Sequence, residues 1–330
     1  MDTIKVGIIG CANVVEKNII SALNNIRNAK LITIASRNEK KAKNWAKRFG
    51  CEYEESYDDV IKRKDVDAIY IPLPVGKHRE WAIKAAKAKK HVLCEKSLAE
   101  SFASVKQMVK TCKDNNVFLY ENFMCDYHPQ HRKVVSMISN GKIGSIFLFR
   151  GFFGFPPLDK ENIRYKKILG GGSLNDAGSY PVFMSRKILQ SEPLYVTCSL
   201  VYDRIKGVDI QGSAQLEFLK NRVALVAFGF NNVYQNDYSV WGSSGLIEVK
   251  RAYAIPPDMK PKIELVKQGL IEKIDAPSAN HFSLIFEDFC GSIIEGKKCD
   301  YSKLILQARV MEALRISSKE NRKVAVADIN

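Results

Sequence analysis

Lys5-Val6-Gly7-Ile8-Ile9-Gly10-Cys11-Ala12-Asn13, near the N-terminus, is the stretch that decides the fold class. Its apolar residues form a continuous run, which is typical of a strand buried on both faces of a parallel sheet. The run ends at Gly10, and residues 13–26 then have the pattern of a helix. A buried strand, a tight turn and a helix in this order predict the first unit of an α/β domain.

The same rhythm continues for about 120 residues. Further buried strands are expected at 30–36, 67–73, 91–96 and 117–123, with helices at 39–49, 78–89 and 101–115. Strands that alternate with helices predict a parallel sheet with right-handed crossovers. We therefore expect one domain over residues 1–121.

After residue 121 the pattern changes. A helix at 129–140 is followed by long alternating segments at 146–155, 195–203, 213–219 and 223–231, and two helices at 280–295 and 302–319 finish the chain. Alternating segments predict antiparallel strands of an open sheet. The expected fold is an N-terminal α/β domain followed by an α+β domain, residues 122–330, with a large, mostly antiparallel sheet.

Composition narrows the function classes. The chain has 330 residues, an apolar fraction of 46% and a net charge of +15, with lysines spread along the helices. No nucleic-acid motif, signal-peptide pattern or membrane-length apolar run of about 20 residues is present, so we expect no nucleic-acid or membrane partner and a cytoplasmic location. The eight cysteines form no CxxC or Cys/His cluster, which predicts reduced thiols and no metal site.

The first turn has the chemistry of a dinucleotide site. Gly10 fills the first position of the GxGxxG pattern, Ala12 replaces the second glycine and Val15 departs from the third. The pattern serves a tight turn whose backbone N–H groups approach a pyrophosphate at a helix N-terminus, as in a Rossmann fold. The predicted cofactor-binding residues of this turn are Gly10, Cys11, Ala12, Asn13 and Val14.

The second strand bears on the choice of cofactor. In NAD sites it usually ends in an acidic residue that binds the ribose 2′-hydroxyl. Here it ends in Ser36 and Arg37, which can bind a 2′-phosphate. The pattern favours NADP, with NAD as the alternative.

Two segments carry candidate catalytic groups. Lys96 follows the strand at 91–96, at the carboxyl edge of the sheet where ligands bind in open α/β folds. Gly170-Gly171-Gly172-Ser173 is expected to open a helix with Ser173 as its cap. Asp176 and Tyr180, four residues apart, would then share one helix face and could handle a proton together.

Together these pieces resemble the Gfo/Idh/MocA oxidoreductases over essentially the whole chain. The resemblance rests on GIIGCA, the segment 71–78 (IPLPVGKH), the segment 95–99 (EKSLA) and GGGSLNDAGSYP. It implies that Pro72, Leu73, His78 and Glu95 join Lys96 at the cofactor. It also implies that Lys96 is catalytic, although Ser97 replaces the family's usual proline.

The segments 123–131, 162–165 and 232–245 resemble a subgroup that includes nucleotide-sugar C-3 ketoreductases. In that subgroup a tyrosine at the position of Tyr180 donates the proton. The resemblance implies that Lys96 assists Tyr180 across the interdomain cleft and that Asp176 orients substrate hydroxyls. The remaining substrate-binding candidates are His128, Arg164 and Tyr165.

The predicted function is transfer of a hydride between NADP and a keto or hydroxyl carbon of a sugar, nucleotide-linked or free. A free-polyol or trans-dihydrodiol dehydrogenase and a non-catalytic NADP-binding regulator are the alternatives. The alternation at 213–219 and 223–231 leaves one sheet face needing cover, so we expect a homodimer or homotetramer.

Overall fold

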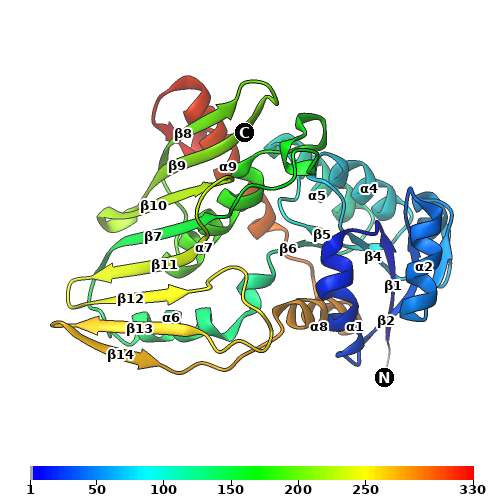
Figure 1. Ribbon diagram of the computed structural model, residues 1–330, viewed down its shortest axis with the longest axis horizontal. Coiled ribbons are helices and arrows are strands. Elements are labelled where there is room, and N and C mark those ends of the chain that lie inside the picture. The colour runs from blue at the N-terminus through cyan, green and yellow to red at the C-terminus, as the bar shows by residue number, and fades with distance from the viewer. Residues whose placement is uncertain (1–2) are drawn as a thin grey trace. The chain divides into compact units, whose positions relative to one another are not determined.

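The computed structural model describes residues 3–330, which form two compact units (Figure 1). The first unit contains the chain up to Met124 together with His281–Ile305, and the second contains Cys125–Asn280 and Leu306–Asn330. The sequence led us to expect one division, at residues 121 and 122. Helix α8 (His281–Ile294) lies instead in the first unit, where it packs on α1, β1 and β2.

The first unit is built on a six-stranded sheet in the order β3-β2-β1-β4-β5-β6. All neighbouring strands pair in parallel. This is the strand order of a Rossmann fold, so the predicted fold class is confirmed. The strands are β1 (Ile4–Ile9), β2 (Ala29–Ala35), β3 (Glu52–Glu54), β4 (Ala68–Ile71), β5 (His91–Glu95) and β6 (Leu119–Asn122).

Side-chain caps determine where three of the connecting helices begin. Asn38, Ser56 and Ser101 each accept a hydrogen bond from a backbone N–H three residues later, as N-cap residues do. The short β3 and α3 were not expected, because neither carries a long periodic pattern. The helices of this unit besides α8 are α1 (Ile20–Asn24), α2 (Glu39–Phe49), α3 (Tyr57–Lys62), α4 (Val75–Lys87) and α5 (Phe102–Asp114).

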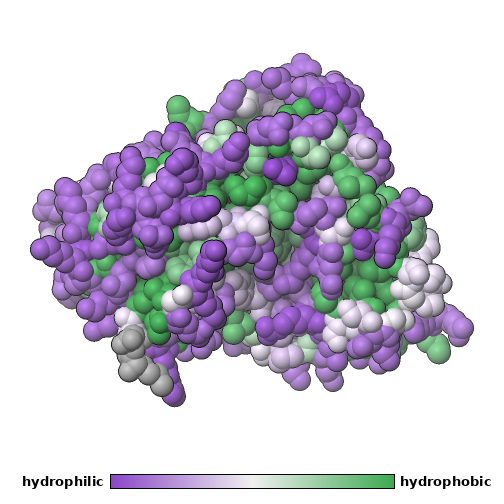
Figure 2. Space-filling model, turned by 180° about the vertical axis from the view of Figure 1, so that it is seen from behind, coloured by the Kyte–Doolittle hydropathy of each residue, from purple (hydrophilic) through white to green (hydrophobic). Residues whose placement is uncertain are grey.

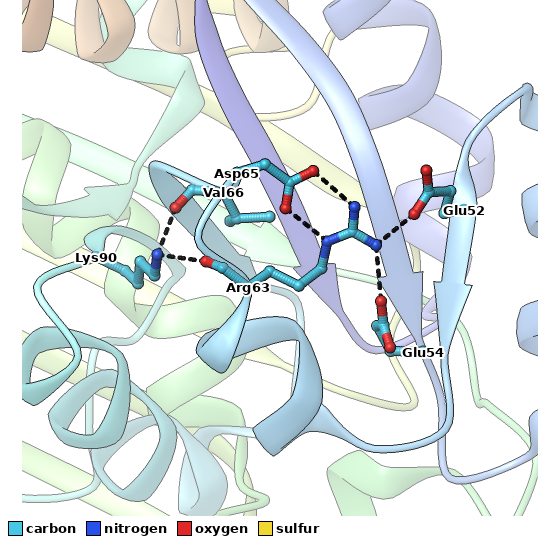
Figure 3. Close-up of polar contacts among 6 residues, drawn as sticks. All are labelled: Glu52, Glu54, Arg63, Asp65, Val66 and Lys90. Atoms are coloured by element: carbon cyan, nitrogen blue, oxygen red, sulfur yellow. Dashed lines mark hydrogen bonds and ion pairs between the residues drawn. The ribbon is translucent and has the colours of Figure 1, made fainter.

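An ion-pair cluster holds the edge strand β3 in place (Figure 3). The guanidinium of Arg63, just after α3, donates to the carboxylates of Glu52 and Glu54 on β3 and of Asp65 in its own loop. Lys90 donates to two backbone carbonyl oxygens of the same loop at 2.6 Å. The cluster joins the edge of the sheet to the loop that leads into β4.

The second unit is built on a nine-stranded sheet in the order β14-β13-β12-β11-β7-β10-β9-β8-β15. Its pairs are antiparallel except β7 and β10, which run parallel, so the expected mostly antiparallel sheet is confirmed with one exception. The strands are β7 (Ile146–Gly154), β8 (Tyr195–Asp203), β9 (Val208–Phe218), β10 (Arg222–Gly229), β11 (Gln235–Gly242), β12 (Gly245–Lys250), β13 (Lys262–Lys267), β14 (Leu270–Ile274) and β15 (Val324–Ala325).

Helices cover one face of this sheet. Helix α6 spans Pro129–Ser139, α7 spans Ser179–Leu189 and packs on β7 and β10, and α9 spans Ser302–Glu320. The apolar residues of the alternating strands lie buried on the covered face: Ala214, Leu216 and Phe218 on β9, and Ala224, Val226 and Phe228 on β10. Their alternation therefore serves the chain's own core.

Hydrophilic side chains are spread across the face of the molecule shown in Figure 2. Over residues 3–330, no helix combines the length and apolar character that a membrane crossing requires. No cluster of three or more His, Cys, Asp or Glu side chains in this range could hold a metal ion.

Candidate functional site

The turn after β1 requires glycine at position 10. Its φ of +132° favours glycine, and a Cβ there would lie 2.9 Å from the Leu73 side chain. The Gly10 N–H donates to the carbonyl of Ala35 at 2.9 Å, which ties the turn to the end of β2. Val15, the departure from the glycine pattern, is fully buried and begins a π-helical turn, Val15–Ile19, that leads into α1.

Cys11 and Ser36 lie together beside this turn. Their side chains are hydrogen-bonded, and burial raises the pKa of the Cys11 thiol to about 11, so the thiol is neutral at pH 7. Ser36 Oγ also accepts the Asn38 N–H at 3.2 Å. Two of the predicted cofactor residues, from the loops that follow β1 and β2, thus meet at one place.

Two residues that sequence reasoning missed join this group. Lys41, on the first turn of α2, donates to the Cys11 carbonyl oxygen at 2.7 Å. Burial raises the pKa of the Tyr57 hydroxyl, and its hydrogen bonds with Arg37 oppose that shift. The only available signal for Lys41 was its place in the first turn of a helix, where a lysine is unfavourable for the helix dipole.

His78 contacts the backbone at or next to two predicted cofactor residues, Leu73 and Lys96. It is fully buried, with Nδ1 2.9 Å from the Ser97 carbonyl oxygen and Nε2 2.6 Å from that of Leu73. Burial lowers the pKa of this imidazole. His78 therefore joins the loop that contains Pro72 and Leu73 to the segment after Lys96.

Glu95 fixes the carboxyl end of β5. Its Oε1 accepts hydrogen bonds from the Tyr70 hydroxyl and the Asn122 amide, both at 2.5 Å. Burial raises the pKa of Glu95, while these two hydrogen bonds oppose the shift. Lys96 follows directly, and the peptide bond between Lys96 and Ser97 is cis. The carboxyl group of Glu95 thus anchors the backbone that presents Lys96.

In the second unit, the predicted helix cap at Ser173 is wrong. Ser173 makes no side-chain cap to its own helix, which opens with a π-helical turn, Leu174–Gly178. Instead Asp209 on β9 accepts hydrogen bonds from Ser173 Oγ at 2.7 Å and from the Leu174 N–H at 2.6 Å. Gly172 leaves room for that carboxylate, since a Cβ there would lie 2.3 Å from Asp209 Oδ1. A carboxylate from a distant strand therefore holds the start of this segment.

Arg164 gathers several predicted residues of the second unit. Its Nε donates to Asp176 Oδ2 at 2.5 Å. The Asp176 carboxylate raises the pKa of the guanidinium, and Tyr180 and Tyr165 lie close enough to contribute to the shift. Asp176, Tyr180, Arg164 and Tyr165 thus form one polar group.

Tyr180 sits in an aromatic cluster. The Phe153 ring meets it edge-on with centroids 5.2 Å apart, the Tyr253 ring stacks on it at 5.8 Å, and only 6% of Tyr180 is exposed. Packing on two rings holds the phenol in one orientation.

His128 has a structural place. It is buried at the start of α6, where its Nδ1 accepts the Gln130 N–H at 3.3 Å. Burial lowers the pKa of the His128 imidazole to about 4, which leaves it neutral at pH 7. These contacts make it the N-cap of α6, in addition to any part in the predicted substrate wall.

Comparisons with known proteins find relatives along almost the whole chain. A family model described as an oxidoreductase family with an NAD-binding Rossmann fold matches residues 4–123, and the GFO/IDH/MocA C-terminal domain matches residues 131–248. A dTDP-3,4-didehydro-2,6-dideoxy-alpha-D-glucose 3-reductase from Saccharopolyspora spinosa is 32% identical over 94% of this chain and 96% of its own. A protein of the same name from Actinomadura kijaniata is 33% identical over 96% of each chain.

Among solved structures, KijD10, a 3-ketoreductase from Actinomadura kijaniata in complex with NADP and TDP-benzene, superposes with a TM-score of 0.92. It is 32% identical, and the match covers 96% of this chain and 98% of that one. Two family models and relatives above 30% identity therefore span nearly the whole sequence, and the chain belongs to the GFO/IDH/MocA family of oxidoreductases.

Proposed function

We propose that this oxidoreductase uses NADPH to reduce a keto carbon of a nucleotide-linked sugar. The observation that carries the proposal is the group around Arg164, which brings a phenol, a carboxylate and a guanidinium together. Such a group can bind sugar hydroxyls and deliver a proton. The 3-reductases named above, which match over almost the full length, support the choice of substrate class.

The cofactor would be held by the residues around the first turn. The backbone from Gly10 to Val14, with Cys11, Ala12 and Asn13 between them, would hold the pyrophosphate through its N–H groups, since the φ of +132° at Gly10 allows the tight turn that such a site needs. Ser36, Arg37 and Lys41 supply two cations and a hydroxyl for a 2′-phosphate. Pro72, Leu73 and Lys96 would lie toward the nicotinamide, with His78 and Glu95 bracing the backbone behind them.

The reaction needs a proton at the oxygen of the reduced carbon. Bound NADPH supplies the hydride. Tyr180 donates the proton to that oxygen, and the Lys96 ammonium stabilises the negative charge that develops there. Asp176, oriented by Arg164, accepts hydrogen bonds from substrate hydroxyls, and Tyr165 forms part of the wall.

A turnover screen tests the proposal. NADPH oxidation is followed with dTDP-linked 3-keto sugars, and NADP reduction with free polyols and trans-dihydrodiols. Turnover of the nucleotide-linked keto sugars and little of the others is expected. Preference for a free polyol or a dihydrodiol contradicts the substrate class, and no turnover of any of them, with tight NADPH binding, favours a regulatory protein.

We expect tighter binding of NADPH than of NADH. Arg37→Ala and Lys41→Ala should each weaken the binding of NADPH by about 1.5–3 kcal/mol, the usual contribution of a hydrogen bond to a charged group. The binding of NADH should change little. Fluorescence titration measures both cofactors. Lys43→Ala is the control, because Lys43 lies on the same helix and pairs with Glu39. Equal affinity of the wild type for the two cofactors would rule out the 2′-phosphate site.

We also propose a homo-oligomer, most simply a dimer, through the uncovered face of the second unit's sheet. The buried apolar residues of β9 and β10 belong to the chain's own core, so the motivation now rests on the opposite face, to which the expected segment 223–231 contributes Leu225. On the uncovered face, Leu225 and Trp241 remain 39% and 53% exposed, and Leu148 pairs with Trp241 across β7 and β11. Apolar residues in the middle of a sheet favour contact with a second copy.

Leu225→Glu is expected to convert the assembly to monomers, since it places a charge in the middle of that face. Light scattering at micromolar protein measures the mass. Lys319→Glu, an exposed position on α9, changes the charge without touching the face and should leave the mass unchanged. A wild type that is monomeric under these conditions contradicts the proposal.

A cytoplasmic location is proposed on the basis of the cysteines. All eight are free, and five of them are buried: Cys94, Cys112, Cys125, Cys198 and Cys290. Unpaired thiols are typical of a reducing compartment.

A further inference from the structure

The turn between β8 and β9 has a fixed shape that sets the direction of Lys206. Asp203 Oδ1 accepts the backbone N–H groups of Ile205 at 2.9 Å and Lys206 at 3.0 Å. The Gly207 N–H donates to the Asp203 carbonyl at 2.8 Å, and Gly207 has a φ of +64° that favours glycine. The side chain that leaves this turn at Lys206 therefore starts from an ordered backbone.

This turn lies against the segment that follows Arg164. Lys206 Nζ is 3.8 Å from the centroid of the Tyr165 ring. A Cβ at Gly207 would lie 3.5 Å from Cδ of Lys167. Tyr165 is in turn held by its hydroxyl, which donates to Asn231 Oδ1 at 2.8 Å. Two segments about 40 residues apart in the sequence thus place their lysines at one spot.

The cations at this spot differ in their pairing. Arg164 pairs with Asp176, and Lys166 pairs with Glu161 at 2.9 Å. Within the described chain, Lys167, Arg204 and Lys206 have no carboxylate oxygen within 4.0 Å. The nearest acid in the turn, Asp203, already accepts two backbone N–H groups. Neighbouring cations repel one another, and a bound anion would relieve that repulsion.

We propose that Lys167, Arg204 and Lys206 bind the diphosphate of a nucleotide-linked substrate. The inference rests on the proposed function, since it starts from Arg164 and Asp176 as the group that holds the sugar. In a nucleoside diphospho-sugar the phosphates are attached directly to the sugar, so they must lie within a few bonds of that group. Tyr165, the residue after Arg164, carries Lys206 on its ring, and the Lys167 side chain lies against the same turn, so two of the cations are close to that group. Arg204 belongs to the turn itself, and the three residues are named here the cation cluster.

The cation cluster also fits the kind of ligand. Lysine ammonium groups act as point charges for phosphate, and an arginine can bind two phosphate oxygens at once. Because Lys167 and Arg204 are exposed, their attraction to a diphosphate is screened by salt. The affinity of the wild type for a diphosphate should therefore fall as the salt concentration rises. In variants that lack these cations, the affinity should depend less on salt.

The test measures binding of dTDP by calorimetry to the full chain. Lys206→Glu and Lys167→Glu are each expected to raise the Kd for dTDP by about tenfold or more, with the Kd for NADPH unchanged. Lys206→Met keeps an aliphatic side chain on Tyr165 and removes the charge. If the charge binds the phosphates, this variant should also lower the affinity for dTDP. Lys206→Arg should retain most of the affinity, and Lys319→Glu is the control for net charge.

Several results would overturn the inference. If the variants bind dTDP as tightly as the wild type, the cation cluster does not bind the diphosphate. Equal losses for dTDP and NADPH would mean that the cluster serves the cofactor or acts only through overall charge. A wild type that binds none of dTDP, UDP and GDP also overturns it. By contrast, if dTDP binding depends on the cluster but no dTDP-linked keto sugar is turned over, the proposed function fails and this site stands.

Discussion

Tyr180→Phe is expected to reduce turnover of a keto sugar by about 10²–10⁴, the usual worth of a positioned proton-transfer group. The substitution removes only the hydroxyl. The phenyl ring keeps its contacts with Phe153 and Tyr253, so the fold and the Asp176–Arg164 pair should remain. Turnover is measured under saturating NADPH and substrate, and NADPH affinity by fluorescence should be nearly unchanged.

The control for this variant is Tyr238→Phe, which also removes a buried hydroxyl. Tyr238 stacks on Phe149 and its hydroxyl contacts His131. It should cost some stability and little turnover. If Tyr180→Phe keeps near wild-type turnover, the proton comes from another group, and a water ordered by Asp176 becomes the first candidate.

The parallel sheet of the first unit could be predicted because its strands are continuous apolar runs separated by helices with clear caps. Helix α2 was expected at 39–49, and the structure has Glu39–Phe49. The short β3 and α3 were missed because three to six residues carry too little periodicity. Helix α8 was assigned to the wrong unit. Its sequence shows that one face is apolar, but not that this face packs on α1, β1 and β2.

The sequence offered candidate residues for the site, but it did not show which distant residues hold them in place. Ser173 was expected to cap its own helix by the local rule, whereas Asp209, 36 residues later, supplies the acceptor. Likewise, nothing local shows that His78 and Glu95 brace the backbone, because their partners lie on other strands and loops. Local patterns identify caps and turns, while long-range hydrogen bonds depend on tertiary packing.

The second large effect is expected for Lys96→Met. This variant removes an ammonium that stabilises developing negative charge and keeps a side chain of similar length. Loss of one such electrostatic group costs on the order of 10²–10³ in turnover. The anchor of the segment should remain, because Glu95 keeps its hydrogen bonds to Tyr70 and Asn122. Lys87→Met, at an exposed position on α4, is the matched control and should leave turnover unchanged.

The double variant Lys96→Met, Tyr180→Phe decides whether the two groups act on one oxygen. If Tyr180 gives its proton to the oxygen whose charge Lys96 stabilises, removing either group disables the same step, so the double variant should be little worse than the worse single variant. If the two groups act in separate steps or at separate atoms, their free-energy effects should add. Additive losses in turnover, measured under the same saturating conditions, would therefore reject a shared role and leave Lys96 as a cofactor-binding residue.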